Sequence, residues 1–185
     1  MKTIARATRR VAGRKKMINS RLEVTNEKTQ GSQSLLLMKS ESFNNIMSYL
    51  SQSFGAPGLS MIYSMGHDSG VKEIKQIREE MKKIEKPLQK KELVDKALQR
   101  MSQMGWGKFD LEELDLITGK IELKIRNNPF SESCAMNDTC GCLFLHGYIS
   151  GIMTESLESE IACASPRCID LDDSHCSIRL MREPK

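Results

Sequence analysis

Residues 140–157 read CGCLFLHGYISGIMTESL, and this stretch decides how the rest of the chain can fold. From Cys142 to about Leu157 its apolar side chains recur at helical spacing. The helix contains Gly147 and Gly151, four residues apart on one face, although each interior glycine costs about 1 kcal/mol of helix stability. We therefore predict that a neighbouring backbone packs closely against this face.

Strand patterns lie on both sides of this helix. Before it, residues 109–125 alternate around a turn at Gly119, which predicts a β-hairpin. A slip in that alternation beyond Leu111 predicts a bulge. After the helix, residues 158–165 and 176–180 alternate again across an acidic turn. We expect them to form a second pair of strands.

Helical patterns precede the first hairpin. Apolar side chains keep a helical period over 43–54, 57–66, 71–84 and 93–104. Gly55 ends the first helix and Gly66 closes the second, so that His67 lies in a turn. The predicted class is α+β, with an N-terminal helical layer packed on an antiparallel sheet made of two hairpins joined by a helix.

The sequence has no segment of the kind that crosses a membrane. Its longest apolar runs, Leu35–Met38 and Cys142–Leu145, are far shorter than the ~20 residues required. No secretory apolar region follows the basic start, so we expect a cytoplasmic protein with reduced thiols and no membrane contact. The polar residues 23–34 are typical of a linker. We predict a basic arm and linker over 1–34 and one domain over 35–182.

Residues 1–22 carry eight basic groups and no acidic one, which leaves the rest of the chain with a net charge of −4. Such an arm is a solvated tail, a contact for nucleic acid or another anionic surface, or an organelle-targeting presequence. Ile4, Ala7 and Val11 would line one face of a short helix, as in a presequence. No aromatic residue is interleaved for base stacking. All three interpretations stay open.

The six cysteines all lie in one 43-residue window, after 133 residues that contain none. They are Cys134, Cys140, Cys142, Cys163, Cys168 and Cys176. Thiols that share one task must meet in space, so the clustering favours a metal or redox site over inert buried cysteines. Cys168 and Cys176 flank a turn, and Cys142 begins a helix whose dipole favours a thiolate. No signature couples a histidine to a thiol, so we assign no catalytic residue.

Three motifs in the second half resemble the 4-vinyl reductase domain family. They are Arg126-Asn127-Asn128-Pro129-Phe130, the run CLFLHGYISG from Cys142 to Gly151, and the run CIDLDDSHC from Cys168 to Cys176. The resemblance covers about residues 35–182. It implies the nitric-oxide-signalling and Golgi-transport ligand-binding fold, in which a helical layer covers an antiparallel sheet and an apolar pocket lies inside.

The resemblance also implies a zinc site. In sensor members of the family one cysteine before the Gly-Tyr-x-x-Gly helix, two cysteines eight apart and a glutamate hold the ion. The matching positions here are Cys142, Cys168 and Cys176, with Ser165 in place of the glutamate. Serine is a poor zinc ligand, so another group has to complete the set. The nearest candidates in the sequence are Cys163, Cys140 and Glu160, of which we take Cys163.

The apolar helices must pack on the sheet that begins near Trp106, and walls of this kind suit a hydrophobic small molecule or form a filled core. The expected pocket residues are Phe43, Met47, Tyr63, Trp106 and Phe144. We expect a non-catalytic, sensor-type protein that binds such a molecule, holds zinc for structure and pairs with a second copy of itself. Two alternatives stay open: an enzyme or enzyme subunit acting on a tetrapyrrole or other hydrophobic substrate, and a DNA-associated regulator that uses residues 1–22.

Overall fold

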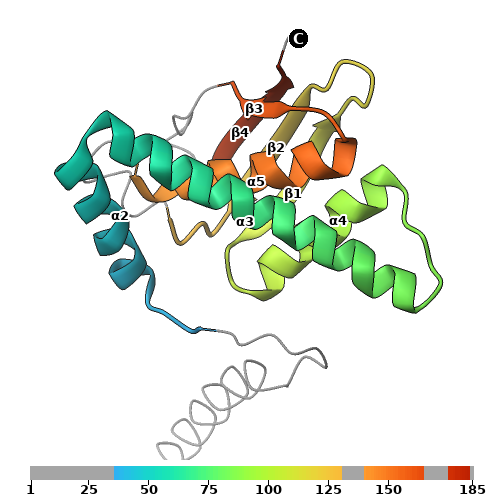
Figure 1. The fold of residues 1–185 in the computed structure, drawn as a ribbon, viewed down its shortest axis with the longest axis horizontal. Helices are drawn as coiled ribbons and strands as arrows, with labels where there is room; N and C mark the ends of the chain where they lie inside the picture. The colour runs from blue at the N-terminus through green and yellow to red at the C-terminus, as the bar shows by residue number, and fades with distance from the viewer. Residues whose placement is uncertain (1–35, 131–139, 165–174, 184–185) are drawn as a thin grey trace, which may run out of the picture. The chain divides into compact units, whose positions relative to one another are not determined.

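A computed structural model describes residues 36–130, 140–164 and 175–183. The chain divides into two units after Leu37, and every element below belongs to the second unit, Met38–Lys185. The described residues of this unit form four helices and one four-stranded antiparallel sheet (Figure 1). The predicted α+β class, with helices packed on an antiparallel sheet, is confirmed.

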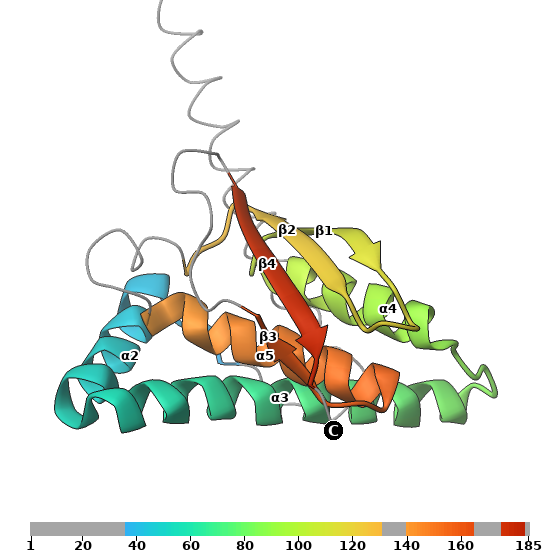
Figure 2. The same ribbon diagram turned by 90° about the horizontal axis from the view of Figure 1, so that it is seen from above.

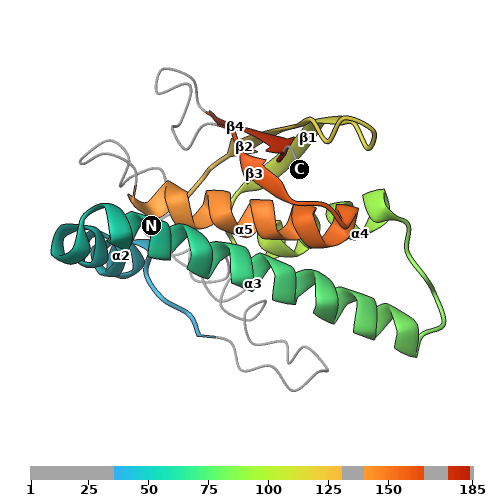
Figure 3. The ribbon, with the colours of Figure 1, turned by 45° about the horizontal axis from the view of Figure 1, so that its top comes forward.

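Two helices run side by side in this unit: α3, Ala56–Lys83, and α5, Cys140–Leu157. No other pair of elements in the described ranges shares so large a contact. Figures 2 and 3 show α5 between α3 and the sheet. Nearly every residue of α5 from Cys142 onward is buried, as expected for a helix that is apolar on all sides.

Glycines on both helices allow the two backbones to approach each other. A β-carbon on Gly147 would lie 2.1 Å from a carbonyl oxygen of α3, and one on Gly66 would lie 2.1 Å from a carbonyl oxygen of α5. Gly151 and Gly70 would meet the opposite backbone at 2.1 and 2.0 Å. No side chain fits at such distances, so only glycine permits this contact. The close backbone approach predicted at Gly147 and Gly151 is confirmed.

The prediction that Gly66 ends a helix and leaves His67 in a turn is wrong. Helix α3 continues through both residues as far as Lys83. Glycine favours a helix end when only the local chain is considered. Here Gly66 faces the backbone of α5, and the packing offsets its low helix propensity. His67 therefore projects from the middle of a long helix.

The other two helices flank this pair. Helix α2, Ser40–Phe54, precedes α3 and ends at Gly55, whose positive φ of 60° is one that side-chain-bearing residues rarely adopt. Helix α4, Lys90–Gln103, follows the break at Pro87 and packs against α3, α5 and β1. The helix ends predicted at Gly55 and before Pro87 are therefore observed.

The sheet has the strand order β1-β2-β4-β3, and all neighbouring strands are antiparallel. The strands are β1 (Lys108–Leu114), β2 (Ile121–Arg126), β3 (Ile161–Cys163) and β4 (His175–Arg182). In the β1–β2 hairpin Leu111 pairs with Leu123, whereas Glu113 pairs with Glu122. This shift of register is the predicted bulge.

The core lies between the helices and one face of the sheet. Its sheet side is formed by Ile121, Leu123, Ile125, Ile178 and Leu180, and its α5 side by Leu145, Ile149, Ile152 and Met153. The other face of the sheet carries ion pairs, such as Arg179 with Glu122 at 3.2 Å. Among the residues that the structure describes, no helix is both long and apolar enough to span a membrane.

Replacing Gly147 by alanine should lower the free energy of unfolding by about 2 kcal/mol, because the added carbon would push against the α3 backbone. At an exposed helix position the same replacement would stabilise the protein. Urea denaturation measures the difference. Ser60→Ala, on the exposed side of α3, is the control and should change stability by less than about 0.5 kcal/mol. A Gly147→Ala protein as stable as the original would contradict the close packing.

Candidate functional site

Two of the predicted zinc ligands meet beside one asparagine. Cys142, in the first turn of α5, is 1% exposed, and Cys176, at the start of β4, is 9% exposed. The amide nitrogen of Asn128 donates to both sulfur atoms, at 3.8 Å for Cys142 and 3.4 Å for Cys176. The two sulfur atoms therefore cannot be farther apart than the sum of these distances. Residues 34 positions apart in the sequence share one buried polar environment.

Asn128 follows β2 and is itself buried. Its side-chain oxygen accepts a hydrogen bond from the backbone N–H of Phe130 at 2.9 Å, which orients the amide group toward the cysteines. The thiol of Cys142 in turn donates to the carbonyl oxygen of Phe130 at 3.7 Å. Sequence reasoning treated Asn128 only as a strand end and part of a motif. An asparagine next to Pro129 within that motif was the available signal.

The other predicted zinc ligands do not lie beside Asn128 in the described part of the structure. Cys163, on β3, lies opposite Leu180, four residues along β4 from Cys176, which corresponds to about 13 Å along the strand. Cys168 and Ser165 lie outside the described residues, as do the side chains of Cys140 and His175. Within the described ranges no three His, Cys, Asp or Glu side chains form a group suited to a metal ion.

Five aromatic rings from four parts of the chain form a cluster, which we call the aromatic cluster. Its members are Phe43 of α2, Trp106 between α4 and β1, Phe130 after β2, and Phe144 and Tyr148 of α5. The Phe43 ring centre lies 5.1 Å from that of Phe144, and Trp106 lies 4.8 Å from Tyr148. These contacts are edge-to-face, the geometry that aromatic quadrupoles favour.

The predicted pocket residues divide between this cluster and its neighbourhood. Phe43, Trp106 and Phe144 belong to the aromatic cluster itself. Met47 is buried in a smaller apolar group beside it, against which Tyr63 packs. Sequence reasoning missed Phe130 and Tyr148, because neither has a local pattern that sets it apart from core residues.

The phenol of Tyr148 interacts with a series of neighbouring charged side chains. Tyr148 is 6% exposed and donates a hydrogen bond to Glu73, which also accepts from Arg100 at 3.1 Å. A second guanidinium nitrogen of Arg100 bonds Glu80. Burial raises the pKa of the Tyr148 phenol, and the negative charge of Glu73 and the hydrogen bond to it raise the pKa further. Tyr148 thus stays neutral and holds its ring against Trp106.

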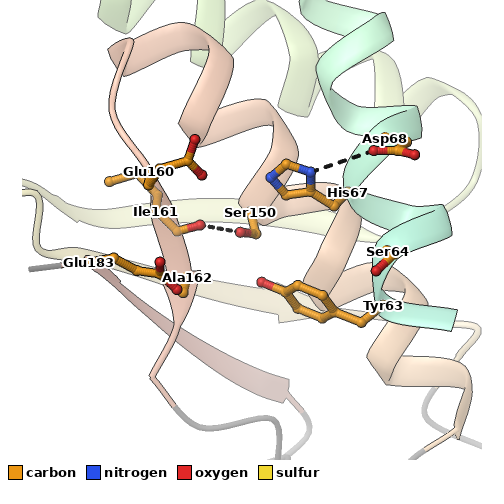
Figure 4. Close-up of a pocket in the computed structure, with 9 residues that line it drawn as sticks. All are labelled: Tyr63, Ser64, His67, Asp68, Ser150, Glu160, Ile161, Ala162 and Glu183. Atoms are coloured by element: carbon orange, nitrogen blue, oxygen red, sulfur yellow. Dashed lines mark hydrogen bonds and ion pairs between the residues drawn. The ribbon is translucent and has the colours of Figure 1, made fainter. Parts of the chain in front are cut away.

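A polar pocket of about 260 Å³ lies where α3, α5 and the β3–β4 edge meet (Figure 4). Helix α3 contributes Tyr63, Ser64, His67 and Asp68, α5 contributes Ser150, and the sheet edge contributes Glu160, Ile161, Ala162 and Glu183. The ring of His67 lies 3.9 Å from Asp68 through Nδ1. This pocket is polar, in contrast to the aromatic cluster.

The chain matches no protein-family model and no curated protein. It is similar in structure to the phenol-responsive sensory domain of the transcription activator PoxR with phenol, at a TM-score of 0.67 and 15% identity over 82% of this chain and 78% of that one. A vinyl-4-reductase family protein from Methanocaldococcus jannaschii matches at 0.50 and 14%, over 91% of this chain and 96% of the other. The chain has the 4-vinyl reductase fold.

The same fold extends to a subunit of a trafficking protein particle complex. Trafficking protein particle complex subunit 3 from Naegleria fowleri, covalently bound to palmitic acid, matches at a TM-score of 0.51 and 13% identity, over 78% of this chain and 93% of the other. The resemblance read from the three motifs is therefore confirmed for the fold. At these identities the ligands belong to those proteins, and the residues of this chain have to carry any argument about its own.

Replacing Tyr148 by phenylalanine should lower the free energy of unfolding by about 2 kcal/mol at neutral pH, because a hydrogen bond to a partly buried carboxylate is lost. The phenol pKa is raised in the folded state, so the contribution of Tyr148 is complete below the unfolded pKa of about 10 and is lost as the pH rises above it. The difference between the two proteins should therefore shrink in alkali. Urea denaturation across this range measures it.

Tyr49→Phe is the matched control, because Tyr49 is 71% exposed on α2. It should leave the stability within about 0.5 kcal/mol of the original at neutral pH. Equal losses in the two variants, or a Tyr148 effect that grows with pH, would contradict the assignment of a neutral phenol bonded to Glu73.

Proposed function

We propose that this protein binds a small hydrophobic molecule at the aromatic cluster and responds to it as a sensor. One observation carries the proposal: Phe130 belongs to both parts of the site. Its ring lies 5.5 Å from the rings of Phe43 and Trp106, and its carbonyl oxygen accepts from the thiol of Cys142. A molecule that displaces the Phe130 ring would thus also disturb the contacts of the two cysteines.

The aromatic cluster offers a ligand apolar ring surfaces and one polar group, the phenol of Tyr148. Its members are aromatic rings, of which Phe43, Trp106 and Phe144 are only partly buried. Flat aromatic rings suit an edge-to-face or stacked contact with an aromatic ligand. Two proteins of the same fold carry apolar groups, phenol in one and palmitic acid in the other. These are the ligand classes that we propose for the present chain.

The proposal includes a zinc ion held by Cys142, Cys168 and Cys176. The donors at hand fit zinc: two buried sulfur atoms lie near one amide, and Cys142 stands in the first turn of α5, where the helix dipole favours a thiolate. The amide N–H of Asn128 can donate to metal-bound sulfur as an outer-shell group. Zinc would supply a structural link between the start of α5 and β4. Cys163, the predicted fourth ligand, lies about 13 Å along the sheet from Cys176, too far for both sulfur atoms to bind one ion, so this position stays unassigned.

The remaining predictions from the sequence concern properties other than this binding site. The basic residues 1–22 lie outside the described residues, so nucleic-acid binding through them stays a prediction. Pairing with a second copy and a cytoplasmic location are likewise predictions. No feature of the described residues favours an enzyme acting on a tetrapyrrole over a binding protein.

Phenol should change the fluorescence of Trp106 in a saturable way, because Trp106 is the sole tryptophan of the chain and lies inside the cluster. Palmitic acid is the second probe. Phe144→Leu should weaken binding of the better probe about fivefold, since it removes an aromatic contact while keeping an apolar side chain. Phe54→Leu, at a position 56% exposed on α2, should bind as the original does. Absence of saturation with both probes would end the proposal.

Zinc should co-purify with the protein, and its removal by a chelator should lower the melting temperature. Cys142→Ser should lose the metal. Asn128→Ala should lower zinc affinity about 10- to 100-fold through loss of the N–H donor. Cys163→Ser should keep the metal, because Cys163 lies too far from Cys176 to bind the same ion. A melting temperature that a chelator does not change would count against a structural zinc ion.

A further inference from the structure

The polar pocket beside β3 exists because of the glycine contact between α3 and α5. The backbones meet at Gly147 and Gly151, next to Tyr63 and His67 of α3. With no side chain on α5 at those positions, Tyr63 and His67 extend past α5 toward the sheet edge, as Figure 4 shows. The result is a hollow of about 260 Å³ between a helix face and a strand.

The floor of the pocket is held in place by hydrogen bonds from α5. The hydroxyl of Ser150 donates to the carbonyl oxygen of Ile161. The backbone N–H of Ile161 donates to Thr154 at 3.0 Å. These bonds use the outer edge of β3, so this side of the pocket is occupied by fixed groups rather than by an open strand edge.

Among the residues that the structure describes, the charges around the pocket are those of carboxylates. Asp68 stands on the α3 side, and Glu160 and Glu183 stand on the sheet side. The last two are joined by their backbones, because the N–H of Glu183 donates to the carbonyl oxygen of Glu160 at 3.0 Å. Within the described ranges no lysine or arginine lines the pocket. Like charges on paired chain segments repel each other unless a cation lies between them.

The arginine of β4 that lies next to Glu183 in the sequence is hydrogen-bonded to another part of the chain. Arg182, directly before Glu183, donates its guanidinium to the carbonyl oxygens of Leu116 and Ile117 in the β1–β2 turn, at 3.3 and 3.1 Å. Some carboxylates elsewhere in the described part of the chain, such as Glu155 and Glu122, have arginine partners. Neither Glu160 nor Glu183 has an ion pair with a described residue.

The α3 side of the pocket adds groups that suit a cation with N–H donors. Figure 4 shows the hydroxyl of Tyr63 pointing across the pocket toward Ala162 and the ring of His67 facing Glu160. A phenol oxygen and a neutral imidazole nitrogen accept hydrogen bonds, and the Tyr63 ring offers a face for a cation. A volume of about 260 Å³ suits a ligand smaller than a drug molecule.

We propose that this pocket binds a small organic cation with primary ammonium groups, with Glu160 and Glu183 at one end and Asp68 at the other. The cavity, the acceptors on α3 and the two glutamates at the sheet end, which have no ion pair with a described residue, together define this ligand class. The pocket is lined by a different set of residues from the aromatic cluster, so this ligand would be independent of the hydrophobic one.

The test uses 1,4-diaminobutane and its neutral counterpart 1,4-butanediol, followed by ¹H–¹⁵N NMR of the full chain. The diamine should shift the amide signals of Tyr63, His67 and Ala162 in a saturable way, and the diol should not. The double variant Glu160→Gln, Glu183→Gln should weaken diamine binding about tenfold or more, because it removes both charges at the sheet end.

Asp95→Asn is the matched control, because Asp95 is an exposed carboxylate on α4 and does not line the pocket. It should bind the diamine as the original does. Equal binding of the diol, an equal loss in Asp95→Asn, or the absence of saturable shifts at these three residues would overturn the proposal. Phenol binding in the same samples reports on the aromatic cluster separately.

Discussion

The contact between two glycine pairs sets the positions of the other helices and strands described in the second unit. Gly66 and Gly70 of α3 and Gly147 and Gly151 of α5 leave no room for a side chain between the helices. The backbones can therefore approach more closely than ordinary helix packing allows, and many dispersion contacts form along the interface. Once α5 is fixed in this way, the side chains on its other faces have defined neighbours in the sheet and in α2.

The two proposed binding regions follow from this geometry. Tyr148 and Ser150 are two residues apart on α5, so they point to different sides of the helix. Tyr148 meets Trp106 in the aromatic cluster, whereas Ser150 bonds Ile161 at the floor of the polar pocket. At the start of the same helix, Cys142 shares the amide of Asn128 with Cys176. One buried helix thus connects an apolar site, a thiol pair and a polar pocket.

Much of the fold could be predicted from the sequence because its signals are local. The two glycines of α5, the bulge beyond Leu111 and the alternation of the strands each depend on residues close together in the chain. Gly66 was predicted to end a helix because its actual role depends on a helix that lies about 80 residues further along the chain. Phe130, Asn128 and Tyr148 were missed as site residues for the same reason: their partners become neighbours only after folding. Cys168, expected from the motif, lies outside the described residues.

The close approach of the two helices can be measured directly by NMR on the intact protein with labelled glycine. A β-carbon on Gly147 would lie 3.0 Å from the backbone nitrogen of His67, and one on Gly151 would lie 3.0 Å from that of Val71. Nuclear Overhauser contacts are therefore expected between the α-protons of each glycine and the amide proton of its partner residue. If both contacts are absent while the sequential contacts of the same glycines are visible, the two helices do not pack through these glycines.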